Sequence, residues 1–303
     1  IQFYCFFNNT ITLEKVMSII FCMKKFFSIL YFFCVLSNIY AQYTIPHKME
    51  WWYHHRFGMF IHFGSYSYYG KGEWVMQIEK WSKDAYQTQI TSQFNPHNFN
   101  AKAIVDVAKS TGMKYIVITA KHHEGFCMWK TNVAGFRDYT GNTVFDLYHY
   151  IGFERDILKE LKDECDAQGI KFCLYYSILD WNHPSQTLHE YFSVMKNMEA
   201  KTDYVLQMKA QLRELITLYK PAVLWFDGDW CENVYPPTLE NWWNKDDAIN
   251  LYNYILSIDS TIIINERVKR ELGLGDFMCP EQKIPDAPLE RQWETCQTMN
   301  GTW

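Results

Sequence analysis

The sequence lacks several patterns that mark common classes of protein. No Cys-x-x-Cys pair occurs among the cysteines after residue 41, so a zinc site is not expected. The formal net charge of −5 gives no reason to expect nucleic acid or an anionic membrane as a partner. We find neither a short-period repeat nor a low-complexity linker. We expect the cysteines of the folded part to be small buried residues, with any pairing left open: Cys127, Cys165, Cys173, Cys231, Cys279 and Cys296.

Aromatic residues, in contrast, are plentiful. With 12 Trp, 21 Tyr and 21 Phe they make up 18% of the 303 residues, and hydrophobic residues as a whole make up 48%. This composition supports a large core, and the length fits one large α/β domain or two smaller ones. A large core explains the aromatic excess better than rings that stack on sugars, although composition alone leaves both interpretations open.

The first 41 residues are expected to lie outside the folded domain. Residues 23–41 have the layout of a secretory signal peptide: a charged start at Met23-Lys24-Lys25, an apolar segment at 26–36, and the small residue Ala41 before cleavage. The apolar segment is too short to span a bilayer, so we predict export, with no membrane span in the mature protein. Residues 1–22 are interpreted as translated upstream sequence.

Strand-like and helix-like segments alternate after residue 42. Short apolar runs rich in β-formers occupy residues 57–63, 114–119, 171–176, 222–227 and 261–265, and helical patterns occupy residues 101–111, 155–167 and 204–219. Repeated strand, helix, strand order indicates parallel pairing, for which a (β/α)8 barrel is the best fit. A doubly wound open sheet is the alternative, but no glycine-rich phosphate turn follows the first strand.

Polar side chains stand where these strands end. In a (β/α)8 barrel the strand ends converge on one face and share one pocket. Carboxylates suited to acid and nucleophile chemistry, His and Arg suited to hydroxyl groups, and aromatic walls together favour a neutral, hydroxyl-rich ring as the ligand. In chain order the residues are His62, His122 with His123, Tyr176, Asp227, Arg267 and Glu281.

Two of these features also have simpler interpretations. Adjacent histidines such as His122 and His123 point to opposite sides of an extended segment, so they would bind a metal poorly. Hydrogen bonding to a substrate is the favoured role, and a zinc constellation is the lesser alternative. Glu73-Trp74 is either part of a loop salt bridge or part of a turn that presents both side chains inward, and the glycines before it favour the turn.

Several motifs occur in a specific order: RFGMFIHFG at residues 56–64, GEW at 72–74, FNP at 94–96, KHHEGF at 121–126, YYS at 175–177, DW at 180–181 and WFDG at 225–228. Together they resemble glycoside hydrolase family 29, the α-L-fucosidases, over residues 49–303. The resemblance implies hydrolysis of a fucosylated glycan without a metal or organic cofactor. It implies that Asp227 is the catalytic nucleophile, and that the fucose is surrounded by His62, Glu73, Trp74, His122, His123, Tyr176, Trp225 and Arg267.

The resemblance leaves two candidates for the acid/base. Glu281 matches the position that serves in the better-matched family members, and Glu294 is the alternative, which would otherwise shape the pocket wall. The implied mechanism is retaining: Asp227 attacks the anomeric carbon while Glu281 protonates the leaving oxygen, and Glu281 then deprotonates the water that releases the sugar. In such a pair the two carboxyl groups lie about 5–5.5 Å apart.

The same comparison bears on where the sequence stops. Residues 293–303 fall inside a family motif, after which family members continue through the last strands of the barrel and a C-terminal β-sandwich. We therefore interpret residues 42–303 as a truncated barrel, and we expect it to fold poorly or to be inactive alone. Two alternative functions stay open: a catalytically inactive sugar-binding barrel, and an exo-glycosidase for a related sugar. Oligomeric state and linkage preference are left open.

Overall fold

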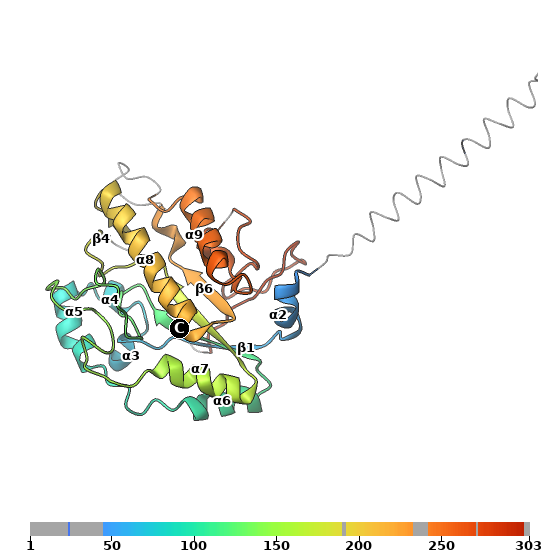
Figure 1. The fold of residues 1–303 in the computed structure, drawn as a ribbon, viewed down its shortest axis with the longest axis horizontal. Helices are drawn as coiled ribbons and strands as arrows, with labels where there is room; N and C mark the ends of the chain where they lie inside the picture. Colours follow the sequence, from blue (N-terminus) through green and yellow to red (C-terminus); the bar gives the residue numbers. More distant parts are fainter. Residues whose placement is uncertain (1–23, 25–44, 190–191, 233–241, 271, 300–303) are drawn as a thin grey trace, which may run out of the picture. The chain divides into compact units, whose positions relative to one another are not determined.

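The part of the protein described below is an α/β unit with a parallel sheet. A computed structural model describes residues 24, 45–189, 192–232, 242–270 and 272–299 (Figure 1). The chain divides into two units, Ile1–Pro46 and His47–Trp303, and the account below concerns the second. The predicted upstream segment and, apart from Lys24, the predicted signal peptide lie outside the described residues. Within the described ranges, each helix is either too short or too polar to cross a membrane.

Five strands form the main sheet, and each pairs in parallel with the next. Across the sheet they are β1 (Gly58–Ile61), β2 (Tyr115–Lys121), β3 (Lys171–Ser177), β6 (Val223–Asp227) and β7 (Ile263–Ile264). All five predicted strands are confirmed. Nearly every residue of β2, β3 and β6 is buried, as is typical of a parallel sheet covered on both faces. The strand order follows the chain without the reversal that a doubly wound sheet has at its switch point.

Parallel pairing continues past β7 as single bridges. Asn265 pairs with Phe277, Met278 with Trp293, and Glu281 with Cys296. The segment around 277–281 therefore lies next to β7, and the segment around 293–296 lies next to it in turn. Both segments extend the order of the sheet in the direction that the five strands set.

Four longer helices belong to this unit: α6 (Ala101–Ser110), α7 (Ile157–Gln168), α8 (Met198–Tyr219) and α9 (Lys245–Ile258) (Figure 1). The first three confirm predicted helices, whereas α9 was not predicted. Each begins at a residue whose side chain accepts a hydrogen bond from a backbone N–H of the first turn, which satisfies a donor that the helix cannot. These caps are Asn100, Asp156, Asn197 and Asn244. Helix α7 contacts both α6 and α8, and α8 contacts α9.

The remaining described elements are short and lie in the connections. The antiparallel pair of β4 (Gln186–His189) and β5 (Phe192–Met195) follows β3 and was not predicted. Most of the others lie either between β1 and α6 or directly after a strand end. They are η1 (His47–Met49), α2 (Glu50–His54), α3 (Tyr66–Tyr69), α4 (Val75–Ile78), α5 (Lys83–Gln89), η2 (Thr91–Gln93), η3 (Asp229–Glu232) and η5 (Glu266–Val268).

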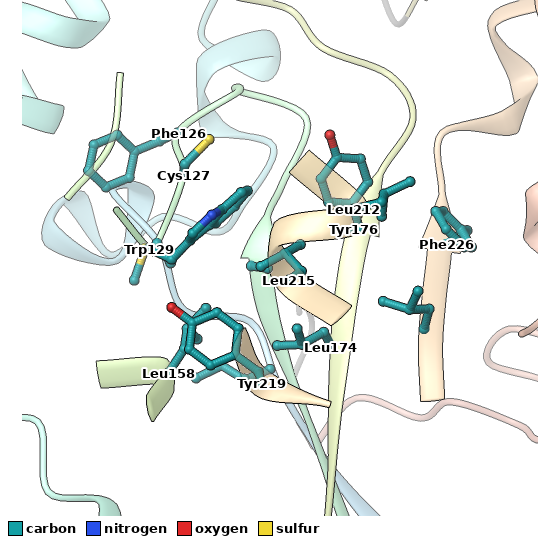
Figure 2. Packing of buried hydrophobic residues seen from close by; sticks show 14 of the residues in the cluster. Phe126, Cys127, Trp129, Leu158, Leu174, Tyr176, Leu212, Leu215, Tyr219 and Phe226 are labelled. Carbon is teal, nitrogen blue, oxygen red and sulfur yellow. The ribbon is translucent and has the colours of Figure 1, made fainter. Parts of the chain in front are cut away.

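The side of the sheet that faces the helices forms the main hydrophobic core. Figure 2 shows Leu174 and Tyr176 of β3 and Phe226 of β6 among Leu212 and Leu215 of α8, and all five are fully buried. Burial of each such side chain contributes about 1.5–3 kcal/mol. Five cysteines are also buried with free thiols, which confirms their prediction as small core residues: Cys127, Cys165, Cys173, Cys279 and Cys296.

Aromatic rings meet on the other face of the sheet. The ring of Phe60 in β1 lies 6.1 Å from that of Tyr175 in β3 and 5.1 Å from that of Trp225 in β6. In a flat sheet, β1 and β6 would be three strand spacings apart, about 14 Å. The short ring distances therefore show that the sheet curves strongly around this face, and that its side chains enclose a small space.

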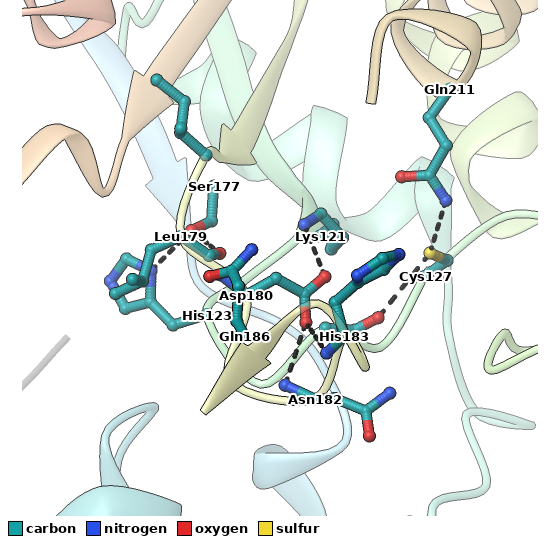
Figure 3. A network of polar contacts seen from close by, with 12 residues as sticks. Lys121, His123, Cys127, Ser177, Leu179, Asp180, Asn182, His183, Gln186 and Gln211 are labelled. Carbon is teal, nitrogen blue, oxygen red and sulfur yellow. Dashed lines mark hydrogen bonds and ion pairs between the residues drawn. The ribbon is translucent and has the colours of Figure 1, made fainter. Parts of the chain in front are cut away.

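A buried ion pair joins the last residue of β2 to the loop that follows β3 (Figure 3). Lys121 Nζ lies 2.9 Å from Asp180 Oδ2, and the two side chains are 0% and 1% exposed. The other oxygen of Asp180 accepts hydrogen bonds from the backbone N–H groups of Asn182 and His183, at 2.9 and 2.8 Å. Gly125 has φ +83°, and a Cβ there would lie only 2.4 Å from Asp180 Oδ1. One carboxylate thus orders both loops.

We expect Asp180→Asn to lower the free energy of unfolding by about 3–5 kcal/mol, because it leaves the Lys121 ammonium buried without a counter-charge. Urea unfolding followed by circular dichroism measures this. The matched control is Asp163→Asn, which removes the partner of Lys159 on the exposed surface of α7 and is expected to cost no more than about 0.5 kcal/mol. Equal losses for the two variants would contradict the prediction.

Candidate active site

Asp227, the last residue of β6, is held by three donors. Its Oδ1 accepts hydrogen bonds from Arg267 Nη1 at 3.0 Å and from Arg270 Nη2 at 3.2 Å. Its Oδ2 accepts from the hydroxyl group of Tyr175 at 3.1 Å. Burial, and then the negative charge of Asp227, raise the pKa of Tyr175, so this phenol keeps its proton and stays a donor.

Arg267 connects Asp227 to a second carboxylate. Its Nη2 donates to Glu281 Oε2 at 2.6 Å, while its Nη1 holds Asp227. The guanidinium lies 4.6 Å from the ring centre of Trp225, which packs against its face. Arg267 is 4% exposed and its planar fork has fixed geometry, so the carboxyl groups of Asp227 and Glu281 are brought to one cavity from β6 and from the segment after β7.

The cavity at these carboxylates has a volume of about 280 Å³, near the small end of the range for ligand pockets. That volume suits one small ring rather than a chain of rings. Its walls combine aromatic rings with charged groups. They are formed by Phe60, His62, Glu73, Trp74, His122, Tyr175, Trp225, Asp227, Trp230, Arg267, Arg270, Glu281 and Cys296.

The histidines of the site are kept neutral. Burial, and then the neighbouring His122, lower the pKa of His62 to about 3, and burial also lowers the pKa of His122 to about 3, against the opposing charge of Asp227. Burial lowers the pKa of His123 as well. At neutral pH each imidazole therefore has one N–H donor and one acceptor nitrogen, which is suited to hydroxyl groups.

Two glutamates near the cavity bind protons more tightly than usual. Burial, and then the charges of Glu281, Glu124 and Asp227, raise the pKa of Glu73 to about 7. Burial, and then the charge of Asp180, raise the pKa of Glu124 to about 8. Glu73 lines the cavity, whereas Glu124 lies behind it, with Oε2 3.6 Å from His122 Nδ1.

The structure brings most of the predicted site residues together, but not all. The placement of Tyr176 in the pocket is wrong: its hydroxyl donates to Gln211 of α8 at 2.8 Å, on the helix side of the sheet. Its neighbour Tyr175 faces the cavity instead, because successive residues of a strand point to opposite faces. His123 lies directly behind the wall, with Nε2 3.8 Å from Asp227 Oδ2.

Glu281 and Glu294 occupy different places. Glu281 lines the cavity and its side chain is 42% exposed, so it faces both the cavity and solvent. Both oxygens of Glu294 already accept hydrogen bonds, one from the Tyr115 hydroxyl at 2.6 Å and one from Trp225 Nε1 at 3.0 Å. Glu294 thus ties β2 to β6 and supports the ring of Trp225.

Five residues of the wall were not predicted as site residues by the sequence analysis: Phe60, Tyr175, Trp230, Arg270 and Cys296. Tyr175 pairs in register with Trp225, which was predicted, so strand register was the available signal. Arg270 lies after the end of η5 and beyond the extended Lys269, so no regular spacing relates it to Arg267. Trp230 lies in the turn after Asp227, and its ring stacks on that of Trp74 at 6.1 Å.

In the ranges that the structure describes, no group of three or more His, Cys, Asp or Glu side chains is arranged to hold a metal ion. The charged groups of the site instead pair with one another. Two carboxylates facing one small cavity, with neutral imidazoles and indole rings around them, form the kind of site that processes a carbohydrate ring.

The comparison with known proteins agrees with this class. The family model described as alpha-L-fucosidase matches residues 41–303, and the chain belongs to this family. It is 28% identical to the tissue alpha-L-fucosidase of Bos taurus and 30% identical to the plasma alpha-L-fucosidase of Homo sapiens, each over 82% of the chain. The chain spans about half the length of these curated relatives, 53% and 54%.

Solved structures show the same relationship. The alpha-L-fucosidase isoenzyme 1 of Paenibacillus thiaminolyticus is similar with a TM-score of 0.68 at 33% identity, over 85% of this chain and 62% of that one. A family 29 alpha-L-fucosidase of Bacteroides thetaiotaomicron is similar with a TM-score of 0.69 at 27% identity, over 83% and 58%. A second structure of the latter is described as a trapped covalent intermediate with 2-fluoro-fucosyl fluoride.

The raised pKa of Glu124 predicts how stability depends on pH. Between about pH 7.5 and 8.5, an unfolded Glu124 has lost its proton, because its ordinary pKa is 4.5, while the folded one titrates only at about 8. The folded state then binds more protons, so the free energy of unfolding should fall as the pH rises through this window. The neutral histidines contribute little there, because unfolded histidine is mostly deprotonated about one pH unit above its ordinary pKa of about 6.5.

We expect Glu124→Gln to make this fall shallower, and the remaining slope comes from the other groups whose pKa burial raises, such as Glu73 and Glu294. Urea midpoints at several pH values between about 7.5 and 8.5 measure it. Glu290→Gln, on the exposed surface, serves as the control with the wild-type slope. A Glu124→Gln slope equal to that of wild type would refute the role of Glu124.

Proposed function

We propose that this protein is a retaining exo-α-L-fucosidase, which removes terminal α-L-fucose from a glycan by double displacement. The observation that carries the proposal is the bridge that Arg267 forms between Asp227 and Glu281 at a cavity with room for one sugar ring. Family membership supports fucose as the sugar. The trapped covalent intermediate of the Bacteroides relative supports a nucleophilic mechanism with retention.

In this mechanism Asp227 attacks the anomeric carbon while Glu281 protonates the glycosidic oxygen. Glu281 Oε2 accepts a hydrogen bond from Arg267, so the carboxyl group must leave that bond before it can donate a proton to the glycosidic oxygen. Its side chain is 42% exposed, so this movement meets little obstruction. The covalent fucosyl ester on Asp227 is then released by a water that Glu281 deprotonates.

We also propose the (β/α)8 barrel as the architecture of the complete domain. Strand order that follows the chain, the strong curvature of the sheet and the further bridges after β7 support it. The predicted signal peptide supports export of the protein, where fucosylated glycans would be its substrates. These inferences concern the whole protein encoded by the gene, of which the chain contains the site described above.

We expect Asp227→Ala to lower kcat for 4-nitrophenyl α-L-fucoside by about a thousandfold or more, because it removes the attacking group. Release of 4-nitrophenol is measured with the 303-residue chain and with the full product of its gene. Asp163→Ala on the exposed face of α7 is the control with unchanged turnover. A folded wild type that hydrolyses another glycoside, or binds fucose without turnover, would overturn the proposal in favour of a related glycosidase or a sugar-binding protein.

A second experiment separates Glu281 from Glu294. Nitrophenolate leaves without a proton, whereas the alcohol of a natural glycan needs one, so loss of the acid should lower kcat/KM much more for the glycan. We expect Glu281→Gln to lose about 10²–10⁴-fold on a fucosylated oligosaccharide and far less on the nitrophenyl fucoside. Glu294→Gln, as a change in support of Trp225, should lower both values equally. The reverse pattern would assign the acid to Glu294.

A further inference from the structure

Ser177, the last residue of β3, lies in a short chain of hydrogen bonds that the mechanism above does not use. Its Oγ lies 2.7 Å from His123 Nδ1 and 2.5 Å from the carbonyl oxygen of Leu179 (Figure 3). Ser177, His123 and Leu179 are all completely buried. Bulk water therefore does not replace any of these partners, and the three groups must satisfy one another.

The direction of these bonds follows from counting protons. A carbonyl oxygen only accepts, so the single hydroxyl proton of Ser177 points to Leu179. The serine oxygen must then accept from His123, which requires the proton of the neutral imidazole to be on Nδ1. As a result His123 Nε2 has a lone pair and no proton.

That bare nitrogen lies beside the nucleophile. His123 Nε2 is 3.8 Å from Asp227 Oδ2 and is buried without a hydrogen-bond partner among the described residues. The rings of Trp74 and Trp230, which line the cavity, contact the imidazole edge to face at 5.2 and 5.3 Å. An acceptor nitrogen thus lies directly behind the cavity wall, beside Asp227.

We propose that Ser177 is a positioning residue that fixes the Nδ1–H tautomer of His123, so that Nε2 accepts a hydroxyl proton of the sugar and does not donate to Asp227. The inference rests on the proposed function for its sugar, but not for its tautomer. With the other tautomer, a small movement would let Nε2–H bind Asp227 Oδ2. That bond would add a further donor to the attacking carboxylate and would remove the acceptor for the sugar.

The protein contains a matched pair with the opposite arrangement. His183 Nδ1 lies 2.7 Å from Ser185 Oγ, and it also accepts the backbone N–H of Ser185 at 3.2 Å. Because Nδ1 accepts there, the proton of His183 is on Nε2, which lies 3.3 Å from Gln207 Oε1. Two buried serine–histidine pairs of equal length therefore set opposite tautomers, and Ser185, which does not line the cavity, provides a control.

The direct test is ¹⁵N–¹H correlation NMR of histidine side chains in ¹⁵N-histidine-labelled protein at neutral pH, with signals assigned from His123→Asn and His183→Asn. We expect His123 as the Nδ1–H tautomer and His183 as the Nε2–H tautomer. Ser177→Ala should shift His123 toward Nε2–H, Ser177→Thr should restore Nδ1–H, and Ser185→Ala should leave His123 unchanged. Wild-type His123 found as Nε2–H overturns the proposal, even if Ser177→Ala does not fold.

Kinetics test the consequence for the sugar. Ser177→Ala should lower kcat/KM on 4-nitrophenyl α-L-fucoside by about 10–100-fold, as the loss of an orienting partner does. With a panel of monodeoxy analogues of the fucoside, wild type should have a strongly reduced kcat/KM for one analogue. Ser177→Ala should show a much smaller reduction for that same analogue. Equal fold reductions of kcat/KM in both proteins would show that Ser177 has only a structural role. Absence of turnover on every fucoside would instead refute the proposed function, while the NMR result still decides the tautomer.

Discussion

The site depends on one cation, the guanidinium of Arg267, buried between two carboxylates. A buried arginine is costly unless it is paired, and here Asp227 and Glu281 supply the pairing. This requirement links three separate stretches of chain, because the end of β6, the turn after β7 and the segment near 281 must all reach one point. The catalytic geometry and the local fold are therefore stabilised by the same contacts.

Behind this charged layer, the protein keeps a neutral one. His62, His122 and His123 lose their affinity for protons through burial, while Glu73 and Glu124 gain theirs. Neutral donors and acceptors at fixed positions can bind hydroxyl groups without competing for the charges of Asp227 and Glu281. Such a layer makes the site costly to fold, and the large aromatic and aliphatic core on the helix side offsets that cost.

Sequence reasoning located the polar strand ends but not which way each side chain points. Asp227, Arg267 and Glu281 were predicted because strand ends of a parallel sheet meet at one edge, and they do meet. Tyr175 and Tyr176 were confused because β3 is buried on both faces and has no polar alternation from which to read its direction. Only the register with β6 resolves this. Arg270 lies beyond any strand, so its return to the cavity depends on the local turn.

Gly125 has a consequence for how such proteins can change over evolutionary time. Its missing side chain leaves the space that the Asp180 carboxylate fills, and that carboxylate in turn neutralises Lys121. A larger residue at 125 would displace Asp180. Loss of Asp180 would leave the Lys121 ammonium group buried without a counter-charge. The three positions are thus exchangeable only as a set, and in diverging lineages they should drift together or not at all.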